Sequence, residues 1–199
     1  MSEELAKKID GMRRASAEEL KDTLPPVLDE IRKHGISGVL GEVPDLLSTI
    51  MKKLIEVDAA RFISAVPEVS DKFMGILWQG VDALATKSDE LTSILDSEEL
   101  KAVLKKTDGK INVNIEASDS PLTGHFTISQ GKLSGGSGLF HFKDMDFRFH
   151  GPTEVLLRLL TDDLALGLSN PKLMTDGHPG LAPFVAPVVQ EVAKLIKGE

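Results

Sequence analysis

The residues best suited to chemistry are histidines that lie near acidic side chains. A metal site needs three or more imidazole, carboxylate or thiolate groups that converge on one point. No H-x-H or H-x-x-x-H spacing occurs, so nothing local brings two imidazoles together. We therefore interpret these histidines as solvent-facing strand residues and expect no bound metal. The residues concerned are His125, His141 and His150, with Asp144, Asp146 and Asp176 as the nearest carboxylate companions.

Motifs for nucleophilic catalysis and for phosphate binding are missing from the sequence. The chain has no cysteine and no tyrosine, which excludes thiol catalysis and thiolate ligands. Ser137 lies between two glycines in an expected strand and not in a G-x-S-x-G elbow. Asp162 and Asp163 are adjacent helical residues and so face different ways. No G-x-x-x-x-G-K-[ST] loop is present. We therefore expect a non-catalytic protein without a cofactor.

Composition and charge narrow the class of protein further. Hydrophobic residues make up 41% of the chain and charged residues 27%. No apolar run approaches the roughly 18 residues needed to cross a bilayer. The first residues, MSEELAKKIDGMRR, lack the long apolar segment of a secretory signal. The net charge of −8 disfavours binding to nucleic acid, which needs a basic surface. We expect a cytoplasmic protein with no transmembrane segment.

The first half of the chain has the pattern of consecutive helices. Ser16 and Glu19 form a capping-box pattern, and Pro44 and Pro67 mark further helix starts. Trp78, the single tryptophan, lies among apolar residues at helical spacing and is interpreted as a core residue. We assign residues 1–107 to a helical region. It buries a core or supplies an acidic docking surface for a protein partner or for a second copy.

At Lys110 the hydrophobic period changes to two. Ile111, Val113 and Ile115 alternate with polar residues, which is typical of a half-buried strand. Further strands are expected at 125–129, from 132 and at 171–176, and helices at 153–166 and near the C-terminus. Gly135 and Gly136 indicate a bulge or a place where another element packs closely on the backbone. We assign residues 108–199 to an α+β domain. Its antiparallel sheet of about five strands carries helices on one face.

Four of the eight phenylalanines lie close together between the third strand and the following helix. If the chain reverses at 144–145, Phe142 lies opposite Phe147 and Phe140 opposite Phe149. All four rings then share one face of a β-hairpin, which satisfies the apolar and the charge pattern in one register. Thr153 is expected to cap the helix that follows, and Gly167 to end it.

The second half resembles the lipid-binding sterol carrier protein domain. The resemblance covers residues 108–199 and rests on the turn 130–132, the strand DFRFHG at 146–151, a Leu-rich helix, and Gly167, Lys172 and Gly177 before a closing helix. It implies helices on one side of a sheet of about five strands, with an apolar tunnel between the sheet and the C-terminal helix. It also implies lipid transfer or presentation.

Two hypotheses follow. In the first, the sheet and helices enclose a cavity for a long apolar ligand, such as a fatty acyl chain, a sterol-like molecule or a phospholipid. In the second, the same residues fill a closed core, and the chain is a protein–protein interaction module or homodimer that docks through its helical half. The residues expected to line the cavity are Phe126, Ile128, Phe140, Phe142, Phe147, Phe149, Leu156, Leu160, Phe184 and Val188.

Overall fold

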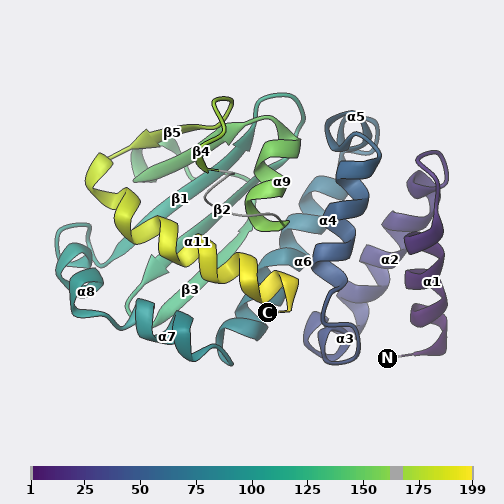
Figure 1. The fold of residues 1–199 in the computed structure, drawn as a ribbon, viewed down its shortest axis with the longest axis horizontal. Helices are drawn as coiled ribbons and strands as arrows, with labels where there is room; N and C mark the ends of the chain where they lie inside the picture. Colours follow the sequence, from purple (N-terminus) through teal and green to yellow (C-terminus); the bar gives the residue numbers. More distant parts are fainter. Residues whose placement is uncertain (1, 162–167, 199) are drawn as a thin grey trace.

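A five-stranded sheet with helices on one face forms the centre of the protein (Figure 1). The computed structural model describes residues 2–161 and 168–198. The fold class is α+β, as predicted, with a helical N-terminal region before the sheet. No helix within these two ranges is both long enough and apolar enough to cross a membrane.

The first helices of the N-terminal region stack outward from the sheet, whereas its last two helices lie beside the sheet (Figure 1). The predicted capping box is confirmed: Ser16 N–H donates to Glu19 Oε2 at 2.8 Å, and Glu19 N–H donates to Ser16 Oγ at 3.3 Å. Ser88 and Ser97 cap later helices in the usual way, through the side-chain oxygen. The helices are α1 (Glu3–Arg14), α2 (Leu20–His34), α3 (Ile36–Glu42), α4 (Leu46–Glu56), α5 (Ala59–Ala65), α6 (Glu68–Ala85), α7 (Asp89–Leu95) and α8 (Glu98–Leu104).

The sheet has the order β3-β2-β1-β4-β5. Neighbouring strands are antiparallel except β1 and β4, which run parallel. The apolar face predicted for β1 is confirmed, because Ile111 and Val113 are buried opposite Ile128 and Phe126 of β2. The strand is not half-buried as predicted, since Asn112 and Asn114 on its other face are buried as well. The strands are β1 (Lys110–Ala117), β2 (Thr123–Ser129), β3 (Lys132–Ser137), β4 (Phe147–Gly151) and β5 (Met174–Gly177).

The predicted hairpin of four phenylalanines is wrong. Phe147 and Phe149 lie on β4, which pairs with β1 and β5. Phe142 instead begins a short 3-10 helix, η1 (Phe142–Asp144), and is 77% exposed. Phe140 is half-buried and packs on His125, with ring centroids 4.4 Å apart. The two pairs of rings therefore belong to different places in the fold and do not share a face.

Residues 138–146 cross the polar face of the sheet to reach β4. Buried asparagines of β1 replace the backbone partners that a hairpin would have supplied. Asn114 Nδ2 donates to Phe140 O at 3.1 Å, and Phe140 N–H donates to Asn114 Oδ1 at 2.9 Å. Asn112 Nδ2 donates to Asp144 O at 2.7 Å. These side-chain hydrogen bonds pair backbone groups of a segment that belongs to no strand. They therefore stabilise the segment against the sheet.

Two further helices complete the face opposite this crossing. Helix α9 (Thr153–Thr161) follows β4, and α11 (Ala182–Lys197) follows the 3-10 helix η2 (Pro179–Leu181). Thr153, predicted to cap, is instead the first helical residue. The predicted end of this helix near residue 166, its cap at 167 and the acidic pair at 162–163 lie outside the described residues. One hydrophobic core runs from Leu5 to Ile196. The division into 1–107 and 108–199 therefore stays a prediction about folding units.

Candidate functional site

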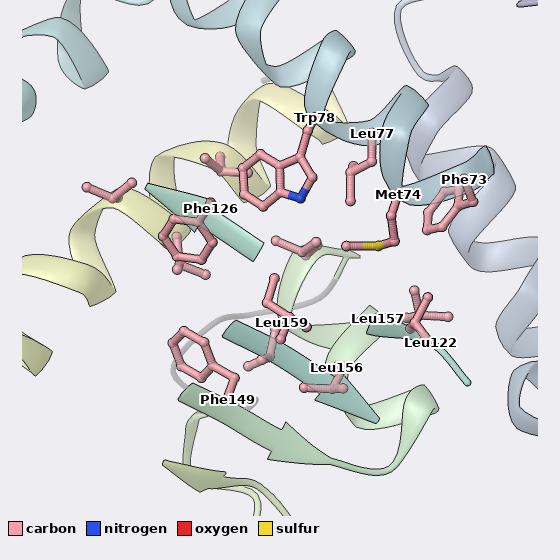
Figure 2. A pocket seen from close by; sticks show the side chains of 15 residues that line it. Phe73, Met74, Leu77, Trp78, Leu122, Phe126, Phe149, Leu156, Leu157 and Leu159 are labelled. Atoms are coloured by element: carbon pink, nitrogen blue, oxygen red, sulfur yellow. The ribbon is translucent and has the colours of Figure 1, made fainter. Parts of the chain in front are cut away.

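An apolar pocket lies between the inner face of the sheet and helices α6, α9 and α11 (Figure 2). The sheet contributes Ile115, Phe126 and Phe149 from three adjacent strands. The helices close the other sides, and every described lining residue has an apolar or aromatic side chain. The remaining residues are Phe73, Met74, Leu77, Trp78, Leu122, Leu156, Leu157, Leu159, Leu160, Val188, Val189 and Val192.

Helix α6 reaches the sheet because two strand positions there have no side chain. A Cβ at Gly124 of β2 would overlap Met74 Cε, and a Cβ at Gly135 of β3 would overlap Trp78 Cδ2. The two residues that need this space lie one helical turn apart on α6, so they point the same way. The close approach predicted for the glycine-rich part of β3 is confirmed, and the element that makes it is α6.

Helix α9 is held at its first turn by the connection between β1 and β2. Asp119 Oδ1 accepts from Thr153 N–H at 2.8 Å and from Thr153 Oγ1 at 2.6 Å. Ser120 Oγ lies 2.7 Å from the same hydroxyl. A carboxylate at a helix N-terminus satisfies free N–H groups and complements the helix dipole. These bonds orient the leucines of α9 toward the sheet.

The free space within the pocket is small. Its volume is about 40 Å³, far below the roughly 300–1,000 Å³ of typical ligand pockets. Apolar cavities stay dry even when they are larger, because water finds no hydrogen-bond partner there. The pocket is therefore a dry seam between sheet and helices, in a form that is closed to a ligand as large as a lipid.

Trp78 is the exception in this lining, because its indole carries a polar N–H group. The residue is 5% exposed, and its ring lies against Phe126 with centroids 5.1 Å apart and an interplanar angle of 33°. Trp78 Nε1 is buried without a hydrogen-bond partner. Figure 2 shows this nitrogen on the edge of the ring that faces the interior of the pocket.

The structure divides the ten residues expected to line a cavity into three groups. Phe126, Phe149, Leu156, Leu160 and Val188 line the pocket. A second group belongs to the core but lies outside this lining. A third group lies near the opposite face of the sheet, so the alternation pattern did not place it correctly. The second group is Ile128, Phe147 and Phe184, and the third is Phe140 and Phe142.

Sequence reasoning missed the contribution of α6. The sequence predicts Trp78 only as a core residue, yet together with Phe73, Met74 and Leu77 it forms one wall of the pocket. The glycines of β2 and β3 were a signal that a large side chain packs on the sheet. They could not show which helix supplies this side chain, because α7, α8 and β1 separate α6 from these strands in the sequence.

The polar face of the sheet carries a group of charged residues, among them Asp176, which was considered as a possible metal ligand. Arg148 bridges Glu116, at 2.9 Å, and Asp176. The hydrogen bond to Asp176, and to a smaller extent that to Glu116, raises the pKa of the Arg148 guanidinium above its ordinary value. His141 accepts a hydrogen bond from Lys143 N–H. A cleft beside Arg148 is lined by His178 and not by His141. Within the described ranges, no three His, Asp or Glu side chains are placed to hold a metal ion.

Comparison with known proteins identifies no family for this chain. No family model matches it, and no curated protein matches it. Among solved structures, Sterol Carrier Protein 2 from Yarrowia lipolytica (apo form) is 13% identical with a TM-score of 0.35. The match covers 62% of this chain and 91% of that one. This is a weak resemblance at the level of the fold.

Proposed function

We propose that this protein binds a long apolar ligand without catalysis, in the pocket between the sheet and helices α6, α9 and α11. The ligand class is a fatty acyl chain, a sterol-like molecule or the acyl part of a phospholipid, held for transfer or for presentation to another protein. The observation that carries the proposal is the lining: fifteen apolar and aromatic residues from the sheet, α6, α9, α11 and the β1–β2 connection converge on one seam. Apolar surface on this scale favours an apolar occupant.

Binding requires the pocket to open, because about 40 Å³ cannot hold an acyl chain. Met74 and Leu160 are suited to move. Met74 has a flexible thioether side chain that adapts to irregular spaces, and Leu160 is only partly buried. The ligand therefore replaces contacts between α9, α11 and the sheet instead of filling a preformed tunnel.

The test measures uptake of a fluorescent fatty acid and a fluorescent sterol by delipidated protein. Val188, which is fully buried on α11, lines the pocket, and Val188→Phe would fill its free space. Val43, partly buried after α3 and outside the lining, provides the matched control Val43→Phe. We expect uptake by the wild type and by the control, and greatly weakened uptake by Val188→Phe. Folding of each variant is checked by thermal unfolding. Absence of uptake by the wild type would rule out the proposal.

A second candidate function is favoured by the small volume itself. If the seam stays closed, its residues serve as core, and the acidic N-terminal helices remain as a docking surface for a protein partner or a second copy. Sedimentation separates the two. Concentration-dependent association without lipid uptake supports docking, whereas a monomer that takes up lipid supports ligand binding.

A further inference from the structure

The indole N–H of Trp78 is a hydrogen-bond donor that the folded chain leaves unused. Its Nε1 atom is buried and has no hydrogen-bond partner. The residue as a whole is only 5% exposed. Buried tryptophans usually place this group against an acceptor, and an unpaired buried polar group in a native structure calls for a specific explanation. Figure 2 shows the nitrogen directed into the pocket and away from α6.

This donor has no hydrogen-bond acceptor within reach, and the lining offers too few polar partners to hold a water molecule. Apart from Trp78, the described residues of the lining carry only hydrocarbon groups and the Met74 thioether, which is a weak acceptor. A water molecule needs two to four polar partners to remain in a cavity, and here it would find one. An occupant of the pocket therefore has to supply the acceptor.

We propose that the ligand carries an uncharged oxygen acceptor, an ester or ketone carbonyl or a hydroxyl, which accepts a hydrogen bond from Trp78 Nε1. This inference rests on the proposed function and defines its ligand class more narrowly. A free carboxylate does not fit at this position, because a buried anion needs a cation or several donors. The described lining provides one neutral N–H. The ligand enters with the acceptor at the α6 side, and its hydrocarbon part runs between the sheet and α9.

The first test uses the wild-type protein, whose single tryptophan produces one indole N–H signal in a ¹H–¹⁵N spectrum. The probes are methyl laurate, tetradecane and laurate, which have similar chains but an ester, no acceptor and an anionic head respectively. Each is delivered from cyclodextrin. We expect methyl laurate to bind most tightly and to move the indole proton downfield. Tetradecane should bind more weakly, without that shift.

The second test is a double-mutant-type cycle, in which the donor is removed by Trp78→Phe and the acceptor by replacing methyl laurate with tetradecane. Trp78→Phe keeps an aromatic ring and removes the N–H, so it should weaken methyl laurate binding by about tenfold beyond any change for tetradecane. Comparing the two probes on the same variant cancels effects of ring size. If Trp78→Phe does not fold, the indole signal of the wild type still decides. Binding of methyl laurate with an unmoved indole signal, or equal affinity for ester and alkane, overturns the inference while ligand binding stands. Failure of all three probes to bind overturns both.

Discussion

The indole ring of Trp78 lies directly on the backbone of Gly135. An added Cβ at Gly135 would overlap Trp78 Cδ2 and come within 2.7 Å of Cγ. It would also lie 2.6 Å from the backbone oxygen of His125 on the neighbouring strand. The absence of a side chain at Gly135 therefore determines how closely α6 approaches the sheet. It thereby also determines the position of the indole N–H in the pocket.

Gly135→Ala should destabilise the protein by about 3 kcal/mol, at the upper end for overpacking, because neither a rigid indole nor a strand backbone can move aside. Gly124→Ala should be milder, about 1 kcal/mol, because the overlapping atom is the end of the flexible Met74 side chain. The measurement is the free energy of unfolding in urea.

Gly136→Ala is the control for these variants. Its added Cβ would lie on the polar face, 3.4 Å from the ring of His125, at ordinary contact distance. Its stability should stay within about 0.5 kcal/mol of wild type. Equal losses for Gly135→Ala and Gly136→Ala would contradict the packing of Trp78 described above.

Asn114 should be needed to hold the segment that crosses the sheet. The side chain is 4% exposed and pairs with both backbone groups of Phe140. Asn114→Ala leaves those groups unpaired, so we expect a loss of about 1–3 kcal/mol and faster amide hydrogen exchange at Phe140. Unchanged exchange at this amide, measured by NMR, would show that the crossing does not depend on Asn114.

Asp119 should control the start of α9. Asp119→Ala removes the acceptor for two Thr153 donors, and Thr153 is fully buried. We expect a loss of about 1–2 kcal/mol in unfolding free energy. Asp119→Asn keeps one oxygen acceptor and should restore most of the loss. A calorimetric series of wild type, Asn and Ala that does not decrease in this order argues against the contact.

The capping box of α2 should contribute a pH-dependent stability. The hydrogen bond from Ser16 N–H, followed by that with its side chain, lowers the pKa of the Glu19 carboxyl below its ordinary value of 4.5. A carboxyl with a lowered folded-state pKa stabilises the fold above the unfolded-state value, and this contribution is lost as pH falls through the folded-state value. Wild type should therefore be more stable than Glu19→Gln at pH 7, and the difference should shrink below about pH 4.5.

The control for this effect is Glu18→Gln, which removes the same charge from the neighbouring position without a capping bond. Chemical unfolding at several pH values compares the three proteins. A difference between wild type and Glu19→Gln that persists unchanged in acid would mean that the charged form of Glu19 is not the source of the stabilisation.

Features that depend on neighbouring residues could be predicted from the sequence. The capping box of Ser16 and Glu19 spans a single turn, and the buried face of β1 follows from strict alternation. The α+β class follows from the change of period at Lys110. Even the close packing on β3 was visible, because consecutive glycines in a strand leave its backbone open to a neighbouring element.

Only the tertiary structure decided which distant segments meet. Alternation around Phe140 and Phe149 is equally compatible with a hairpin and with two separate segments, and the bonds from Asn114 select the second. Thr153 finds its partner in Asp119, far away in the chain. Trp78 has the sequence environment of an ordinary core residue, and only the approach of α6 to Gly135 turns its N–H toward the pocket. These contacts depend on packing and hydrogen bonding between residues that are far apart in the sequence. The hydrophobic periodicity of a single element contains no information about them.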